Sequence, residues 1–229
     1  MNLYKFQTVN SRSLEALVKS SLYFAETKKL NDATEGMFHL LSLYDEDKYL
    51  PDFTDLDKFG VLSMAKGDSN EVEQSPFMWA HYGNQLKGFC LVFHFEEFVG
   101  NIESDLYLNG DVKYVNGRSF PSLTNSDSGL VEVPGTDFKA DNKKRVCRSC
   151  FFQKPKEFSN EKEYRFLSEE SGLKRYHTDS LSKIIIGERM DISDKVILLN
   201  FLENLGFSKK VEYATTKDNS FKVYTEKRD

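Results

Sequence analysis

The sequence contains little cysteine, proline or tryptophan, and it has no long apolar run. Its 229 residues include 3 Cys, 5 Pro and 1 Trp. Small secreted domains usually depend on several disulfides, so three cysteines indicate reduced thiols. No apolar stretch approaches the roughly 18 residues that a membrane-spanning helix needs, and Met1 is not followed by a basic and then apolar leader. We therefore expect a cytoplasmic protein with no membrane partner.

Several widespread motifs of catalysis and metal binding are also absent. The chain contains no G-x-x-x-x-G-K-[ST], no G-x-G-x-x-G and no G-x-S-x-G. A P-loop, a Rossmann dinucleotide site and an α/β-hydrolase nucleophile are therefore unsupported. Cys147 and Cys150 form one C-x-x-C pair, but a structural zinc site needs four ligands and the histidines are scattered. We expect no metal site, and we expect these two cysteines to be buried thiols.

The residues that are present indicate a folded protein with a large core. Hydrophobic residues make up 39% of the chain and aromatic residues 14%, which excludes a disordered chain because burial of this surface can offset the loss of conformational entropy. The formal net charge of −5 argues against a protein that coats DNA. The length is sufficient for one large domain. We predict a single domain over residues 1–229.

Short apolar segments alternate with segments of helical periodicity. We expect strands at residues 3–6, 21–25, 61–65, 89–95, 112–115, 163–167, 183–186, 211–213 and 221–224. We expect one helix capped by Ser13 and others over 37–41, 75–88, 138–152 and 193–205. The run 89–95 is almost continuously apolar, which is typical of a central strand covered on both faces. The predicted fold class is therefore α+β, with a mixed β-sheet core and flanking helices.

Two carboxylates, Glu161 and Glu163, lie two residues apart in the segment N-E-K-E-Y-R-F. Residues i and i+2 of a strand share a face, so both side chains would project together. Paired carboxylates repel each other, which raises the affinity of at least one of them for a proton or a cationic partner. The alternative is an exposed edge strand on which Lys162 and Arg165 act as counter-charges.

Aromatic and polar residues gather on the two early strands and just after them, and again on the helix expected over 75–88. The early set comprises Tyr4, Lys5, Tyr23, Phe24 and Asn31. Such aromatic residues form core more often than a site, but the polar ends of the strands favour a site slightly. On the later helix, His81 is either a proton shuttle or a hydrogen-bonded structural residue, and Tyr82 follows it directly.

Two further patterns leave alternative functions open. Residues 139–156 carry seven Lys or Arg side chains and one acid, which suits a nucleic acid or the pyrophosphate of a dinucleotide, or else a solvated helix face. Asp111 and Lys113, with Glu97 or Asp105 upstream, resemble the D-x-K half of a restriction-type magnesium site. The alternatives are therefore a non-catalytic module that binds nucleic acid or protein through residues 139–156, and a metal-dependent nuclease.

Four motifs occur in order and resemble a widespread bacterial family that is known as a domain of unknown function. They are L-Y-K-F, L-Y-F-A-x(4)-L-N-D-x-x-E-G, W-A-H-Y-G-x(3)-K-G-F-C-L-x-F and K-P-x-x-F-x-x-E-K-E-Y-R, and together they cover about residues 3–187. The sequence departs from this family at Ala33 and Thr34, where Pro and Phe are usual. Residues 188–229 would then pack on the family-like region as a helix and strands.

A more distant resemblance connects the chain to the ADP-ribosyltransferase superfamily. The segment 22–26, followed by a helix, resembles the G-I-Y-F-A-D segment of poly(ADP-ribose) polymerases, and the E-x-E at 161–163 resembles that of ADP-ribosylating toxins. In that superfamily a first-strand His or Arg anchors the nicotinamide end of NAD, a second-strand Tyr or Ser packs beside it, and a late-strand Glu stabilises the ribose cation. The resemblance implies an ADP-ribosyltransferase-like fold and assigns these catalytic roles to Tyr23 and Glu163, with Glu161 orienting the acceptor. Lys5 stands near the first-strand anchor but is neither His nor Arg.

The resemblance implies NAD as substrate and ADP-ribose transfer to a macromolecular acceptor, either protein or nucleic acid. The residues that it suggests for holding NAD are Tyr4, Lys5, Phe24, Asn31, His81, Tyr82 and Arg165. A bacterial toxin or anti-phage effector is the role that this chemistry suggests, and a neutralising antitoxin would then be a partner.

Overall fold

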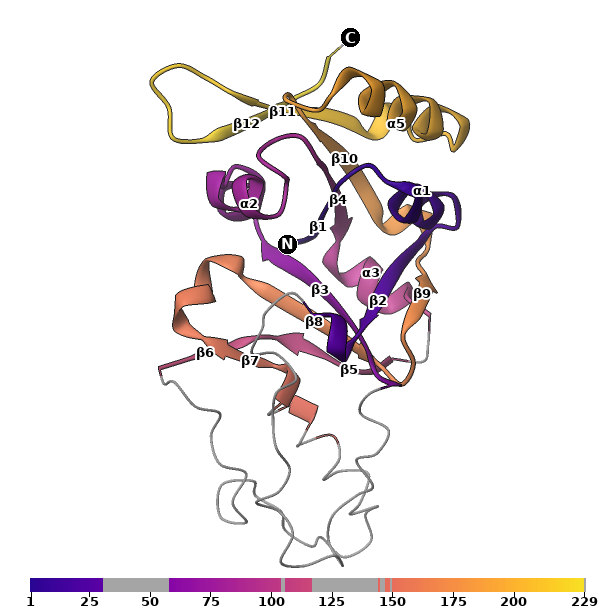
Figure 1. Ribbon diagram of the computed structural model, residues 1–229, viewed down its shortest axis with the longest axis vertical. Helices are drawn as coiled ribbons and strands as arrows, with labels where there is room; N and C mark the ends of the chain where they lie inside the picture. The colour runs from indigo at the N-terminus through magenta and orange to yellow at the C-terminus, as the bar shows by residue number, and fades with distance from the viewer. Residues whose placement is uncertain (31–57, 104–105, 117–143, 145–146, 149, 229) are drawn as a thin grey trace, which may run out of the picture.

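Ten strands of the described chain form one mixed β-sheet (Figure 1). The computed structural model describes residues 1–30, 58–103, 106–116, 144, 147–148 and 150–228. The sheet contains β1 (Asn2–Gln7), β2 (Ser21–Glu26), β3 (Gly60–Gly67), β4 (Phe89–His94), β5 (Leu106–Asp111), β8 (Glu163–Ser168), β9 (Gly172–Arg175), β10 (Leu181–Gly187), β11 (Val211–Thr216) and β12 (Val223–Glu226). Its pairs are antiparallel except for β10–β11. A separate parallel pair joins β6 (Lys113–Val115) and β7 (Gln153–Pro155).

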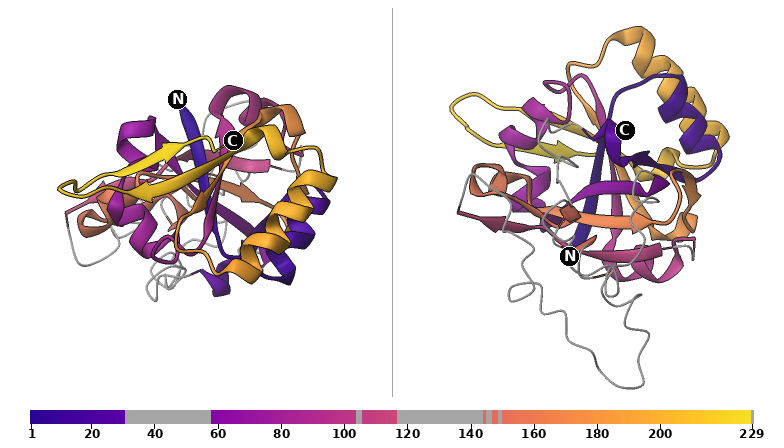
Figure 2. Two further views of the ribbon diagram at one scale, coloured as in Figure 1. Left: turned by 90° about the horizontal axis from the view of Figure 1, so that it is seen from above. Right: turned by 60° about the horizontal axis from the view of Figure 1, so that its bottom comes forward.

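Helices cover both faces of this sheet (Figures 1 and 2). One face packs on α1 (Ser11–Val18), α3 (Phe95–Asn101) and α5 (Ile192–Asn204), and the other on the π-helix η4 (Ser69–Glu73) and α2 (Pro76–His81). Short 3₁₀ segments lie at η1 (Thr27–Lys29), η5 (Lys156–Glu161), η6 (Thr178–Ser180) and η7 (Ser208–Lys210). None of the helices in the described ranges is both long and apolar enough to cross a membrane.

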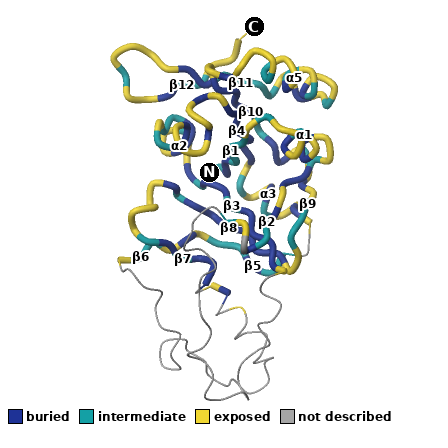
Figure 3. Tube along the Cα trace, in the orientation of Figure 1, coloured by how far each residue is buried: buried dark blue, intermediate teal, exposed yellow. Residues whose placement is uncertain are grey.

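The strand β4 is buried on both faces, as its apolar run predicts. Leu91 and Phe93 contribute to the cluster under α1, α3 and α5, whereas Cys90 and Val92 contribute to the cluster under α2. Figure 3 shows the buried trace running through the central strands while the exposed positions follow the helices and turns. Burial of alternate side chains on opposite faces therefore fixes β4 at the centre of the sheet.

The strand β3 pairs with three other strands, and two of them leave a gap between them along one edge of β3. On one edge it pairs with β8 along most of its length. On the other edge β1 pairs with its C-terminal part, where Tyr4 lies opposite Ala65, and β2 pairs with its N-terminal end, where Ala25 lies opposite Val61. Residues 62–64 have no partner on that second edge among the described strands. A fork therefore forms between β1 and β2, with β3 at its base.

Most of the predicted elements are present, and the α+β prediction of a mixed sheet with flanking helices is confirmed. Every predicted strand is found, with bounds that differ by at most three residues. The sequence missed α3, which follows β4 without an intervening turn, and the strands β5, β7 and β9. The helix predicted at 37–41 lies outside the described residues, and so does most of the helix predicted at 138–152.

Two helix ends differ from the prediction. Asn10, not Ser13, caps α1: its side chain accepts two backbone N–H groups, and Ser13 completes a capping box. The helix α2 ends at His81 rather than near Gly88, because residues 84–86 adopt φ values of 49°, 58° and 67°. This left-handed conformation costs roughly 1–2 kcal/mol per residue and is held by the buried Leu86 side chain.

Gly187, at the end of β10, allows this left-handed turn to lie against the sheet. A Cβ atom at Gly187 would lie 2.1 Å from the carbonyl oxygen of Leu86, so Gly187→Ala should lower the free energy of unfolding by about 1–3 kcal/mol. Urea midpoints measure this change. Gly100→Ala is the matched control, because Gly100 lies in α3 with nothing within 4 Å, and we expect it to stabilise by roughly 0.5–1 kcal/mol. Equal midpoints for the two variants would contradict the tight approach at Gly187.

Candidate functional site

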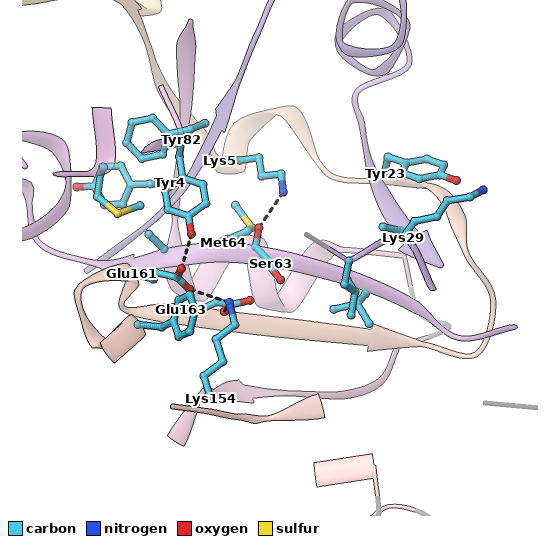
Figure 4. A pocket seen from close by; sticks show the side chains of 17 residues that line it. Tyr4, Lys5, Tyr23, Lys29, Ser63, Met64, Tyr82, Lys154, Glu161 and Glu163 are labelled. Carbon is cyan, nitrogen blue, oxygen red and sulfur yellow. Dashed lines mark hydrogen bonds and ion pairs between the residues drawn. The ribbon is translucent and has the colours of Figure 1, made fainter. Parts of the chain in front are cut away.

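A cavity of about 270 Å³ lies in the fork between β1 and β2 (Figure 4). Side chains of β1, β2 and β3 line it, together with Tyr82 just after α2 and with residues of the segment 154–163. These segments are far apart in the sequence. The opening of the sheet at residues 62–64 therefore brings them together around one cavity.

Four charged side chains are buried beside this cavity, each at most 8% exposed: Lys154, Glu161, Glu163 and Arg165. Lys154 Nζ lies 2.7 Å from Glu161 Oε2 and 2.8 Å from Glu163 Oε2. Arg165 Nε lies 2.6 Å from Glu163 Oε1, and its Nη1 donates to the carbonyl oxygen of Phe151 over 2.7 Å. Two positive and two negative charges therefore compensate each other, as burial requires, because an unpaired buried charge is strongly unfavourable.

Glu161 and Glu163 meet at Lys154 through a bend in the chain rather than through a regular strand. Glu161 is the last residue of η5, Lys162 is left-handed with a φ of 48°, and Glu163 begins β8. The prediction that both glutamates share one strand face is therefore wrong. Lys162 turns outward and forms an ion pair with Glu71. Because β8 is buried between β3 and β5, the alternative of an exposed edge strand is also wrong.

The ion pairs hold Glu163 in its charged form. Burial alone would raise the pKa of Glu163, but the guanidinium of Arg165 and the ammonium of Lys154 lower it to about 2. Both carboxylate oxygens accept from these two cations. Glu163 is therefore ionised and fixed in orientation at neutral pH.

Lys5 projects from β1 into the cavity and reaches the gap in β3. Its Nζ donates to the carbonyl oxygen of Ser63 over 2.9 Å. Burial lowers the pKa of Lys5, and the negative charge of Glu163 raises it in part. No carboxylate in the described part of the chain forms an ion pair with Lys5. Lys5 therefore provides the cavity with a nitrogen donor that pairs with no carboxylate of the described residues.

Two tyrosine hydroxyls bind the acidic pair. The Tyr82 hydroxyl donates to Glu161 Oε1, and the Tyr114 hydroxyl accepts from the backbone N–H of Glu163 over 2.8 Å. Burial raises the pKa of Tyr114 to about 12, and burial together with the bonded carboxylate raises the pKa of Tyr82 well above its ordinary value. Both phenols therefore stay protonated at neutral pH.

Tyr23 and Lys29 lie at the other end of the cavity from the acidic pair (Figure 4). Tyr23 is 48% exposed, so its ring is available to a planar group in the cavity. Lys29 Nζ lies 2.8 Å from Glu26 Oε1. This end of the cavity therefore offers an aromatic surface beside a lysine that is paired with a carboxylate, and the other end holds the acidic pair.

The residues that the sequence suggests for the site fall into two groups. Those that line the cavity are Tyr4, Lys5, Tyr23, Tyr82, Glu161 and Glu163. Phe24 is fully buried in the core, His81 is exposed and packs its ring on Phe77, and Arg165 lies behind Glu163. Asn31 lies outside the described residues.

Lys154 has a different place from the one that the basic stretch 139–156 suggests. It is buried between two carboxylates, so it is not part of a solvated basic surface. Arg148 is exposed and lies over the Phe152 ring, with its Cζ 5.7 Å from the ring centre. Lys154 lies in the same motif as both glutamates, K-P-x-x-F-x-x-E-K-E-Y-R. This shared motif is the sequence signal that could have identified Lys154 as a residue of the site.

The D-x-K and C-x-x-C patterns have ordinary structural surroundings. Asp111 Oδ1 lies 2.9 Å from Lys66 Nζ, and Lys113 is exposed on β6. Cys147 and Cys150 are buried thiols that form no disulfide, as predicted. Within the described ranges, no group of three or more His, Cys, Asp or Glu side chains is arranged to hold a metal ion.

The pairing of Glu163 predicts how the stability depends on pH. Its folded-state pKa of about 2 is below the ordinary value of 4.5, so the stabilisation is present above pH 4.5 and is lost as the pH falls toward 2. This shift corresponds to roughly 3 kcal/mol. Urea titrations between about pH 5 and pH 2 should therefore show a shallower loss of unfolding free energy for Glu163→Gln than for the wild type. Glu97→Gln, on the exposed side of α3, is the matched control and should lose unfolding free energy with pH as the wild type does. The same pH dependence in the wild type and both variants would contradict the ion pairing of Glu163.

Residues 78–166 match one protein-family model, and this segment contains Tyr82, Lys154, both glutamates and Arg165. No curated protein and no solved structure is similar enough to the chain to count as a match. The resemblance to a domain of unknown function is therefore confirmed over residues 78–166, and the family that this segment matches is described as "Protein of unknown function (DUF2971)".

Proposed function

We propose that this protein is an NAD-dependent ADP-ribosyltransferase that transfers ADP-ribose to a macromolecular acceptor, either protein or nucleic acid. The observation that carries the proposal is the convergence of Lys5, Tyr23 and the pair Glu161 and Glu163 on one cavity. The superfamily resemblance selects these residues by motif alone, from three distant parts of the chain. Their meeting in space is what a shared NAD site requires.

The order of these residues also supports an ADP-ribosyltransferase-like fold. Lys5 lies on the first strand, Tyr23 on the second, and Glu163 begins a late strand of the same sheet. The superfamily places its anchor, its aromatic residue and its glutamate in this order. We propose that the fork between β1 and β2 is the NAD-binding crevice.

The chemistry of the cavity suits parts of NAD. The Lys5 amino group offers a hydrogen-bond donor near the position of the first-strand anchor, and the exposed ring of Tyr23 offers a stacking surface for nicotinamide. Arg165 and Lys154 are already engaged by the glutamates. They therefore act on the ligand by holding the carboxylates rather than by binding phosphate.

Cleavage of the bond between ribose and nicotinamide passes through an oxocarbenium-like state, which a nearby carboxylate stabilises. Glu163 carries a negative charge whose position is fixed before any ligand arrives. A fixed charge needs no reorganisation as positive charge develops on the ribose. This role is the one we propose for Glu163, with Glu161 directed toward the acceptor.

The same proposal extends to the biological role. A cytoplasmic enzyme that modifies macromolecules with ADP-ribose would serve as a bacterial toxin or an anti-phage effector, and a neutralising antitoxin would be its partner.

Release of nicotinamide from NAD by the purified protein, alone and with cell lysate, tests this function. Tyr23→Ala should raise the KM for NAD about tenfold or more, because stacking contributes roughly 1–3 kcal/mol. Since Tyr23 is half exposed, its loss leaves the core intact. Phe221→Ala is the matched control: Phe221 is 97% exposed and does not line the cavity.

Glu163→Gln should abolish release at a temperature at which circular dichroism shows it to be folded. The proposal fails if the folded wild type neither releases nicotinamide nor gains thermal stability from NAD. Nucleic-acid binding through the exposed members of the stretch 139–156 would then be the function to test, by its dependence on salt.

A further inference from the structure

We propose that Tyr82 relays a proton from the acceptor to Glu161 during transfer, and that the acceptor group is a hydroxyl. The inference rests on the proposed function and names the class of acceptor at the same site. It starts from a contact that the motifs do not reveal, because Tyr82 and Glu161 are 79 residues apart in the sequence.

The Tyr82 hydroxyl joins the cavity to the acidic pair. It donates its hydrogen to Glu161 Oε1, and the side chain lines the cavity while remaining 37% exposed (Figure 4). A phenol oxygen that donates one hydrogen bond still has lone pairs to accept another. An incoming hydroxyl can therefore donate to Tyr82 while Tyr82 donates to Glu161.

The backbone holds Tyr82 in this position. The amide of Tyr82 donates to the carbonyl oxygen of Met78, and the amide of Gln85 donates to that of Trp79. The left-handed residues 84–86 then turn the chain away, with Leu86 buried. The strained turn thus keeps α2 from continuing beyond His81, and it directs the Tyr82 phenol to the cavity rather than into a longer helix.

The charges around Glu161 allow it to receive a proton. Lys154 is shared between Glu161 and Glu163 at 2.7 and 2.8 Å, so it keeps a carboxylate partner when Glu161 becomes neutral. Glu163 has Arg165 as a second partner and remains ionised. Protonation of Glu161 therefore leaves no buried cation without a carboxylate. Of the two glutamates, Glu161 is the one suited to act as the base.

The step balances in atoms and electrons. The bond between ribose C1′ and nicotinamide breaks, and its electron pair leaves with nicotinamide. The acceptor oxygen forms the new bond to C1′ with a lone pair and gives its proton to the Tyr82 oxygen. Tyr82 passes its own proton to Glu161 and is left as a neutral phenol. Glu161 afterwards releases the proton to water.

A hydroxyl is an acceptor that this arrangement suits. A carboxylate is already ionised near neutral pH and has no proton to lose, whereas a hydroxyl has to lose one as it attacks. The attacking hydroxyl belongs either to water, which gives hydrolysis of NAD, or to a macromolecule. Radiolabelled NAD separates the two, because only the second places the label on an acceptor.

The test compares wild type, Tyr82→Phe and Glu161→Gln in nicotinamide release, with NAD affinity measured separately by calorimetry. Tyr82→Phe should lower the rate about 100-fold or more, the usual contribution of general acid–base catalysis, while the Kd for NAD changes little. The double variant should be no slower than the slower single variant, because both residues serve one proton path. Tyr224→Phe is the matched control: Tyr224 lies on β12, its hydroxyl bonds the Ser220 side chain, and it does not line the cavity.

A readout that a purely structural role would not change is the solvent isotope effect. The wild-type rate should fall in D₂O, and Tyr82→Phe should lose most of this dependence. An active wild type with an equally active Tyr82→Phe would overturn the relay and leave the proposed function standing. A Tyr82→Phe variant that is slow only because its NAD affinity has fallen would also overturn the relay and leave the proposed function standing. Absence of NAD turnover and NAD binding in the wild type would overturn both.

Discussion

The structure depends on how one edge of β3 is divided between β1 and β2. β1 takes its C-terminal part and β2 its N-terminal end, which leaves residues 62–64 without a strand partner on that edge in the described chain. Unpaired backbone groups away from water are unfavourable, and Lys5 meets this requirement by donating to the carbonyl oxygen of Ser63. The same gap creates the cavity, so the irregularity of the sheet and the presence of a site have one cause.

The buried charges beside the cavity link the stability of the protein to the arrangement of its site. Lys154 and Arg165 hold two carboxylates that would otherwise repel each other, and they fix Glu163 in its ionised form. Removal of one partner from such a cluster would leave an uncompensated charge, which is far less favourable than the intact cluster. The groups that we propose for chemistry are therefore also part of the core, and their geometry is set before a ligand arrives.

Local patterns predicted the elements well where packing agreed with them. The apolar run of β4 identified a central strand, because both of its faces meet helices. The helix α2 was predicted too long, because periodicity carries no information on the left-handed turn at 84–86, which depends on the burial of Leu86 against another part of the chain. The expectation that Glu161 and Glu163 share one strand face failed in the same way, since a single left-handed residue, Lys162, separates η5 from β8.

The sequence by itself determined the fold class, the order of most strands along the chain and the residue types that gather at the cavity, because these follow from local periodicity and from motifs. Tertiary structure decided which residues meet. The pairing of Tyr82 with Glu161, the burial of Lys154 in a stretch that looks basic, and the contact of Lys5 with Ser63 all join positions on different elements. Such contacts depend on strand registers and on the fork in the sheet, and one-dimensional spacing does not contain either.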